Sequence, residues 1–447
     1  MTRKWDLSIQ KSILTKFSSS LVMCCLASKA FASGFALQEQ SVTLLGTAYS
    51  GTAALAEDAS TGYYNPAGLT RIIDSQIVLS AILIQGDFKL TADSATNSFR
   101  FPMGGGTARP GKVSLVPTFH LAKRIDDRWV LGFNVTTPFG LATRYKEDSI
   151  ARYLATNSDI ATIDLSPSIA YQILPSFSLG FGVDAQYADA TLSADFSGFD
   201  NQIIHDGYQR NHASGWGYGL HFGALWEPLE TTRVGLAYRS LVNLHVEGNS
   251  ENQTQLGYVP VRVHTDITVP ESATLSLYQE LNRCLALTGD IAWTNWSRFH
   301  TLRLRYNRII NITNPFNGAP AIAPDIDTFE HFKDTRRFAL GLIYTMDDTW
   351  RFRGGVAYDQ SPVRNEFRTL RLPDSDRYWL AVGGAYAVND SFNIDFGYAH
   401  LFFKDSSIHE HAPFIAQTQT PVTAATLDGK FKSSANLVGI QIRYDFV

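Results

Sequence analysis

The chain has 447 residues, with 38 Lys and Arg against 42 Asp and Glu and a formal net charge of −4. This acidic balance argues against a nucleic-acid partner, because binding nucleic acid needs a basic face. A membrane-spanning helix needs about 18 consecutive apolar residues, and the sequence has no such run.

Residues 1–32 predict a secretory signal peptide. Basic residues from Arg3 to Lys16 precede a short apolar stretch at 21–27, and Ala30-Phe31-Ala32 supplies the small residues of a cleavage site before Ser33. The apolar stretch is far shorter than the roughly 20 residues of an anchor helix. Cleavage after Ala32 would remove a net charge of +4, leave −8 on the mature chain, and keep Cys284 as its single cysteine.

Residues 33–73 show no alternation of apolar and polar residues. About forty residues are too many for a simple lead-in to the first strand. The residues after them alternate as the strands of a barrel do. We therefore expect 33–73 to fold as a hatch, or plug, inside the lumen of that barrel, since a wide barrel needs one unless it is an open pore.

The rest of the chain, 74–447, alternates with the period of two that is typical of strands. From Trp216 to Trp226 the aromatic and large apolar residues share one face, while glycine and His221 lie on the other. Large apolar residues opposite a small, polar face indicate lipid on one side and a lumen on the other. The predicted fold is therefore all-β, an antiparallel transmembrane barrel of about 14 strands, at 76–88, 113–123, 129–135, 163–171, 177–187, 216–226, 234–238, 273–277, 285–293, 338–344, 350–358, 378–386, 392–402 and 437–446.

Short and long connections alternate between these strands. Tight polar turns such as 125–128, 346–349 and 388–391 each lead into an aromatic residue, as in a hairpin whose aromatic stands at the membrane interface. We expect the long connections, at 89–112, 140–160, 193–213, 240–271, 300–335, 359–377 and 403–433, to be ordered surface loops facing outwards. The last strand, 437–446, is amphipathic and aromatic, which suits the barrel assembly machinery.

The third strand ends in Thr137-Pro138-Phe139-Gly140. Proline removes a ladder donor and glycine weakens a strand, so this stretch predicts a defect in the wall. The alternative is that Pro138 simply ends the strand at an outer loop.

Several motifs resemble the FadL/TodX family of outer-membrane long-chain fatty acid and hydrocarbon transporters. They are Asn65-Pro66-Ala67 within 46–69, Phe139 to Thr143, Thr294 to Ser297, Asp359 to Val363 and Leu372 to Leu380, in order along the mature chain. The resemblance implies a fourteen-stranded barrel closed by an N-terminal hatch. It also implies a groove among the outer loops, a deeper pocket reached by the N-terminus, and lateral exit through a kinked third strand.

The same resemblance suggests site residues. The hatch and gate would be Phe35, Asn65, Pro66 and Ala67, unless Phe35 lies in a disordered tail, and the exit would be Thr137 to Gly140. The family's basic ligand positions fall here on Ala194 and Thr328, which are not basic. The headgroup candidates are therefore the inward residues Arg239, Arg351 and Arg353, unless they pair with lumen acids, of which Asp184, Asp290, Asp359 and Asp395 are available.

The predicted function is passive uptake of long-chain fatty acids or related hydrophobic molecules across the bacterial outer membrane. The alternatives are an aromatic hydrocarbon importer of the same family, a general porin, and an adhesin or phage receptor. We expect no enzyme activity, since His221 has no Gly-x-Ser-x-Gly elbow to accompany it, no cofactor and no metal. The acids at 347–348 and 374–376 are better explained as turn residues than as calcium ligands. The expected partners are the hydrophobic ligand, membrane lipid and lipopolysaccharide, with the chain as a monomer.

Overall fold

A computed structural model describes residues 33–446, apart from 201–202, 255–256, 308, 314–319, 323–324, 417, 421 and 423. The predicted signal peptide, 1–32, lies outside the described residues. Within this described part, no helix has the length and apolar character needed to cross a membrane.

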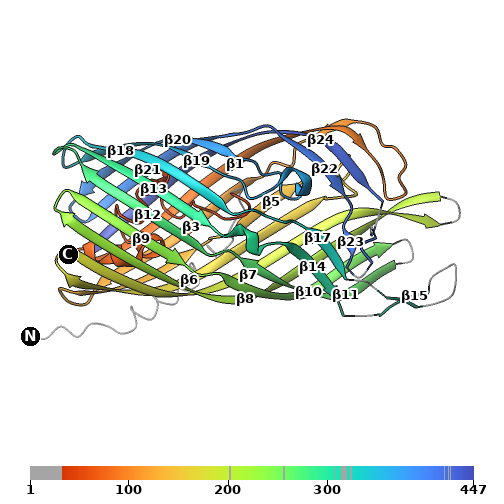
Figure 1. Cartoon of the computed structure of the whole chain (residues 1–447), viewed down its shortest axis with the longest axis horizontal. Coiled ribbons are helices and arrows are strands. Elements are labelled where there is room, and N and C mark those ends of the chain that lie inside the picture. The colour runs from red at the N-terminus through yellow and green to blue at the C-terminus, as the bar shows by residue number, and fades with distance from the viewer. Residues whose placement is uncertain are drawn as a thin grey trace, which may run out of the picture.

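The chain forms a closed antiparallel barrel of fourteen strands, which confirms the predicted fold (Figure 1). Each strand pairs with the next, and the first closes the barrel against the last. Several strands consist of two segments because the ladder is interrupted. In order around the barrel they are β1 (Ser75–Ala95), β2 with β3 (Gly106–Ala108, Val113–Arg124), β4 with β5 (Trp129–Thr136, Gly140–Arg144), β6 (Asn157–Leu174), β7 (Phe177–Asp200), β8 (Ile203–Leu229), β9 with β10 (Thr232–Arg239, Val242–Thr254), β11 with β12 (Gly257–Val269, Ser272–Glu280), β13 with β14 (Leu285–Thr294, Thr301–Tyr306), β17 with β18 (Ile326–Phe329, Thr335–Thr345), β19 (Trp350–Asp359), β20 (Arg377–Asn389), β21 with β22 (Phe392–Phe403, Ser406–His411) and β24 (Thr426–Phe446).

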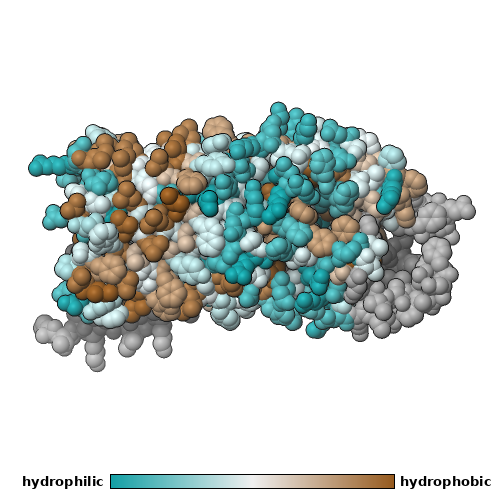
Figure 2. Space-filling view, viewed as in Figure 1, coloured by the Kyte–Doolittle hydropathy of each residue, from teal (hydrophilic) through white to brown (hydrophobic). Residues whose placement is uncertain are grey.

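The outward faces carry a continuous apolar band. In β8, Trp216, Leu220 and Phe222 are exposed, whereas His221 between them is buried. Figure 2 shows this band in brown over the half of the barrel that holds the C-terminus, and hydrophilic side chains in teal over the other half. The alternation therefore assigns lipid to the outside of the barrel.

Two of the predicted loops are wrong. Segment 193–213 belongs mainly to a hairpin in which β7 and β8 stay in register from Phe177 and Trp226 to Asp200 and Ile203. Segment 240–271 contains the β10–β11 hairpin, paired from Val242 and Val269 outwards. These extensions lie beyond the lipid band, where the outward residues are polar, as at His245 and Glu247 of β10, while Leu244 and Val246 face inwards. They therefore lack the outward apolar face that marks the membrane part. Smaller outer elements are β15 (Ile309–Thr313), β16 (Pro320–Ile322), β23 (Phe414–Ile415), η2 (Trp296–Arg298) and η3 (Asn365–Phe367).

Residues 33–73 lie inside the barrel and contain the short helices α2 (Val42–Leu45), α3 (Thr61–Tyr64) and η1 (Pro66–Arg71) (Figure 1). Backbone amides of this segment bond to side chains of the wall. The amide of Val42 donates to Gln441 Oε1 at 3.0 Å, and that of Gly51 donates to Asp290 Oδ1 at 2.7 Å. Because the segment lacks long regular elements, side chains of the wall satisfy the backbone groups that would otherwise be unpaired.

Close approach of the hatch to the wall depends on wall glycines. A Cβ on Gly180 would collide with the backbone of Pro66 and Ala67, and one on Gly223 would collide with Asn65. The inner face is therefore small where the hatch is densest. Apolar side chains complete the contact, as Leu45 and Tyr49 of the hatch pack in one buried cluster with wall residues including Ile82, Trp379 and Leu437.

Candidate functional site

The N-terminal end of the hatch is a buried aromatic cluster. Phe35 is 4% exposed, and its ring centroid lies 4.8 Å from Trp296, 5.5 Å from Phe299 and 5.8 Å from Phe139. Such edge-on and tilted rings add attraction beyond the area that they bury. Phe35 is therefore packed in the lumen and does not lie in a free tail.

Hydrogen bonds to the loop between β19 and β20 hold this end of the hatch in place. The amide of Gly34 donates to Asp374 Oδ2 at 2.8 Å, and Ser33 Oγ donates to the carbonyl of Gln360 at 2.7 Å. Ser361 Oγ also donates to Asp374, at 2.7 Å. The loop thus fixes Phe35 over the space beneath it.

That space is an almost wholly apolar cavity of about 60 Å³. Phe35 and Phe139 form one side of it, and the inner faces of β6, β7, β10 and β11 supply most of the rest, including Ile160, Ala188, Leu244, Val246, Ile267 and Val269. This volume is well below the roughly 300 Å³ at which pockets for drug-sized ligands begin. The cavity is therefore closed around Phe35, and an extended apolar ligand would need that ring to move.

Beside the cavity, the wall is broken between β4 and β5. The β3–β4 ladder joins only Phe119–Arg124 to Val130–Val135, and β5 pairs with β6 alone. The outer half of β3, from Val113 to Thr118, therefore has its one ladder partner in β1. The interruption falls at 137–139, the stretch in which the sequence predicts a wall defect.

The hatch supplies the hydrogen bonds that the interrupted strand lacks. Leu37 donates its amide to the carbonyl of Pro138 at 2.8 Å, and Gly140 donates its amide to the carbonyl of Phe35, also at 2.8 Å. The side-chain amide of Gln40 bonds both backbone groups of Thr137. Its Oε1 accepts the N–H of Thr137 at 3.0 Å, and its Nε2 donates to the carbonyl of Thr137 at 2.7 Å. The segment that closes the apolar cavity thus also seals the break.

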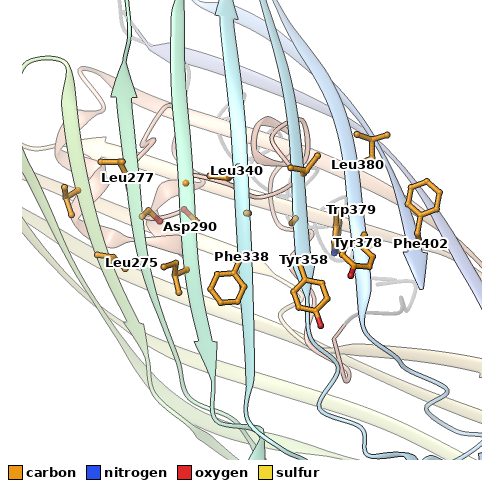
Figure 3. Close-up of a pocket in the computed structure, with 17 residues that line it drawn as sticks. Leu275, Leu277, Asp290, Phe338, Leu340, Tyr358, Tyr378, Trp379, Leu380 and Phe402 are labelled. Carbon is orange, nitrogen blue, oxygen red and sulfur yellow. The ribbon is translucent and has the colours of Figure 1, made fainter. Parts of the chain in front are cut away.

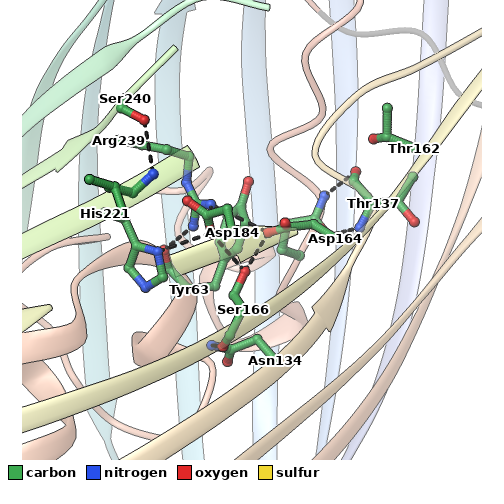
Figure 4. Close-up of polar contacts among 12 residues, drawn as sticks. Tyr63, Asn134, Thr137, Thr162, Asp164, Ser166, Asp184, His221, Arg239 and Ser240 are labelled. Atoms are coloured by element: carbon green, nitrogen blue, oxygen red, sulfur yellow. Dashed lines mark hydrogen bonds and ion pairs between the residues drawn. The ribbon is translucent and has the colours of Figure 1, made fainter. Parts of the chain in front are cut away.

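A charged cluster on the inner faces of β6, β7, β8 and β9 lies beside this break (Figure 4). Arg239 Nη1 lies 2.5 Å from Asp184 Oδ1, and Arg239 Nη2 donates to the carbonyl of Tyr63 in the hatch at 2.9 Å. His221 Nδ1 lies 2.9 Å from the same carboxylate, and Asp164 lies 3.4 Å from the arginine. A cavity of about 110 Å³ between this cluster and Pro138 has Arg239 and His221 in its lining.

The other two candidate arginines join the hatch to the opposite wall. Arg353 lies 3.0 Å from Asp395 and 2.6 Å from Glu57 of the hatch, and Arg351 also pairs with Glu57. Each of the three headgroup candidates therefore already has a carboxylate partner, and Asp184 and Asp395 were among the expected ones. Such contacts favour a structural role, because breaking a buried pair leaves an uncompensated charge.

A large cavity lies outside the barrel, on its lipid-facing wall (Figure 3). It is an open groove of about 910 Å³ whose outward lining includes Leu275, Leu277, Leu340 and Leu380. Since these side chains point away from the lumen, the groove is no part of the path through the hatch.

The acids considered for calcium act in turns and loop contacts. Asp347 Oδ1 accepts the amides of Thr349 and Trp350, at 2.9 and 2.7 Å. Among the described residues, no group of three or more His, Cys, Asp or Glu is arranged to hold a metal ion.

A plugged barrel with an apolar cavity and an interrupted wall strand has the architecture of an outer-membrane transporter of hydrophobic compounds, not of an open pore. The comparisons with known proteins agree. A family described as outer membrane protein transport protein (OMPP1/FadL/TodX) matches residues 23–446. The chain belongs to this family, whose members are transporters and not enzymes, and it is a bacterial outer-membrane protein.

One curated relative and two solved structures illustrate the similarity. The long-chain fatty acid transport protein of Salmonella typhi is 30% identical over 433 residues, covering 90% of this chain and 94% of its own length. A crystal structure of a Pseudomonas aeruginosa FadL homologue has a TM-score of 0.80 at 23% identity, with 93% of this chain and all of that one covered. The Ralstonia pickettii toluene transporter TbuX has a TM-score of 0.65 at 17% identity over 94% of this chain and 99% of its own. The two structures share the fold of this chain.

Proposed function

We propose that the protein takes up long-chain fatty acids or related hydrophobic molecules passively across the outer membrane. The observation that carries the proposal is the double role of residues 35–40, which cover an apolar cavity and also bond the break at Pro138 and Gly140. A relative named as a long-chain fatty acid transport protein and another named as a toluene transporter support the class of ligand.

In this proposal the ligand passes from the outer loops into the cavity beneath Phe35. The ring moves aside, residues 35–40 leave the break, and the ligand exits between β3 and β5 into the bilayer. Asn65, Pro66 and Ala67 keep the rest of the hatch docked, so that the lumen never becomes a water-filled pore. The unit 33–73 acts as the hatch and 74–447 as the wall, in a protein that works as a monomer after removal of 1–32 and assembly by the barrel machinery.

We also propose that Arg239, Arg351 and Arg353 hold the hatch and do not bind the ligand's carboxylate. Arg239 is shared between two aspartates, while Arg353 bridges Asp395 and Glu57. A ligand carboxylate would have to enter beside these acids, which opposes its binding.

An aromatic hydrocarbon is the alternative ligand, and the small volume of the closed cavity favours it. Uptake of radiolabelled oleate and of radiolabelled toluene by a transporter-null host that expresses this chain separates the two. No gain for either compound over empty vector would refute the proposed uptake. Deletion of 33–73 tests the porin alternative, because a porin would conduct as before, whereas a hatch transporter would become leaky.

The exit is tested by restoring the strand with Pro138→Val and Gly140→Val. Uptake should be lost while ligand binding to the purified protein is kept. Pro260→Val with Gly354→Val is the matched control, since Pro260 lies in the continuous β10–β11 ladder and a Cβ on Gly354 would meet no atom within 3.4 Å. Uptake that persists in the first variant, or is lost equally in the control, rules out exit through the break.

A further inference from the structure

A cluster of lysines lies on the outward face of β1 and β24, just beyond the lipid band. The outward apolar residues of these strands end at Leu83 and Val438, and Phe402 on the adjacent β21 stands opposite Ser434. Lys432 lies two residues from Ser434 on the same face, about 7 Å further along the strand towards the outer loops. Its position is therefore the level at which the headgroups of the outer leaflet begin.

Two of these lysines face each other. Lys89 of β1 stands directly opposite Lys432 of β24, and Lys430 follows on the same face of β24. All three are exposed. Opposite residues of an antiparallel pair have Cβ atoms about 5 Å apart, and like charges at that spacing destabilise the sheet. An unfavourable pair on a regular ladder indicates a site that is completed by an anion.

The carboxylates that the structure describes pair with only one of the three lysines in this cluster. Asp87 pairs with Arg109, Asp428 lies 2.9 Å from His409, and Asp405 is 3.8 Å from Lys432. Within the described part of the chain, Lys89 and Lys430 have no carboxylate within ion-pair distance. Two lysine charges thus remain available to an external anion.

The apolar groove of Figure 3 begins one strand away from the lysine cluster. Phe402 of β21, next to β24, lines the groove together with Tyr358 and Tyr378. Lys404 stands above these tyrosines, with its Nζ 5.2 Å from the ring centroid of Tyr358 and 3.0 Å from Asp376. Cations at headgroup level therefore adjoin a long apolar depression that runs along the lipid side.

We propose that this face binds one lipopolysaccharide molecule of the outer leaflet. The phosphate groups of its lipid A moiety lie between Lys89, Lys430 and Lys432, and its acyl chains occupy the groove lined by Leu277, Leu340 and Leu380. A phosphate monoester carries nearly two negative charges and three acceptor oxygens, and lysine binds such groups as a point charge. The site is separate from the lumen and does not depend on what the barrel transports.

The test is a titration of the detergent-purified full-length protein with diphosphoryl lipid A, followed by native mass spectrometry. The variant carries Lys89→Ala, Lys430→Ala and Lys432→Ala. A basic residue near an anionic lipid surface contributes about fivefold in affinity, so the three together should weaken binding about a hundredfold. The control replaces Lys123, Arg128 and Arg283 with alanine, which removes three exposed cations from the opposite rim. We expect the control to bind as the wild type does.

Two competitors distinguish the source of the phosphate. Inorganic phosphate and phosphatidylglycerol vesicles should displace lipid A poorly, because neither fills both the lysine cluster and the groove. Unchanged lipid A binding in the triple variant, an equal loss in the control, or full displacement by inorganic phosphate would each overturn the proposal.

Thermal unfolding supplies a second readout. In detergent free of lipopolysaccharide, the triple variant should unfold no earlier than the wild type, since a repulsive pair has been removed. Added lipid A should raise the unfolding temperature of the wild type and leave the variant unaffected. An equal rise in both proteins, or a variant that unfolds earlier without lipid, would mean that the lysines serve the fold alone.

Discussion

Replacing Asn65 with alanine tests how the hatch is held. The side chain is fully buried, and its Nδ2 donates to the carbonyls of Ala53 at 2.6 Å and Ala224 at 3.0 Å. Its Oδ1 accepts the amide of Ala67 at 3.0 Å. One side chain thus joins two parts of the hatch to β8, while the ladders of the barrel do not depend on it.

The expected cost follows from these three hydrogen bonds. At about 1 kcal/mol each, their loss weakens docking of the hatch by about 3 kcal/mol. If the hatch docks as one unit, its undocked fraction rises about 150-fold. Because the strand pairings are untouched, the barrel itself should stay folded.

Single-channel recording in planar bilayers measures the undocked state directly. Asn65→Ala should open roughly a hundred times more often than the wild type, with unchanged heat-modifiable migration of the barrel on gels. Asn436→Ala is the matched control, since Asn436 accepts a 2.8 Å hydrogen bond from Tyr398 on the outward side of the wall. Openings that stay rare in Asn65→Ala, or become equally frequent in the control, would refute the reasoning.

Two further predictions concern the wall and the outer loops. Gly180→Ala should produce the same leak as Asn65→Ala, because the new Cβ collides with the hatch at Ala67. The control Gly354→Ala has room for a Cβ and should not leak. Unaltered conductance in Gly180→Ala would contradict the close packing of the hatch against the wall. Burial raises the pKa of Glu330 to about 8, with a further contribution from Glu410, and burial raises the pKa of Glu410 to about 7. The folded state therefore binds more protons than the unfolded state from about pH 4.5 to 8, so stability should fall as pH rises through this window. Glu330→Gln should flatten the dependence of the unfolding temperature on pH, and an equally steep profile in that variant would be the contrary result.

Alternation predicted the membrane part of the barrel because lipid imposes it. Leu79 and Leu83 must point outwards, and Val78 and Ile82 between them inwards, since the solvents on the two faces differ. Beyond the lipid band that constraint ends. The β7–β8 and β10–β11 hairpins there are held by backbone pairing. In β10 the outward residues are polar, as at His245 and Glu247, so the outward apolar residues that identify a membrane strand are missing.

Only part of the candidate site could be predicted from the sequence, because alternation fixes the direction of a side chain only in the strands. The inward direction of Arg353 follows from strand periodicity, and so does its partner Asp395 on a nearby strand. Glu57, its second partner, lies in the aperiodic hatch, where no pattern fixes the direction of a side chain. Gln40 and Asp374 were missed because their roles depend on contacts with Thr137 and Gly34, 97 and 340 residues away.

The bonds at the break also set a lower limit on the ligand in the proposed function. Release of residues 35–40 breaks two backbone bonds, to Pro138 and Gly140, and two bonds between Gln40 and Thr137. At about 1 kcal/mol each, the opening costs about 4 kcal/mol, and more if the freed groups face lipid. Burial of a methylene contributes about 0.8 kcal/mol, so about five methylenes are needed to offset the opening. Long acyl chains have more than five methylenes and short polar solutes have fewer. The hydrogen bonds that close the break therefore select for long apolar ligands.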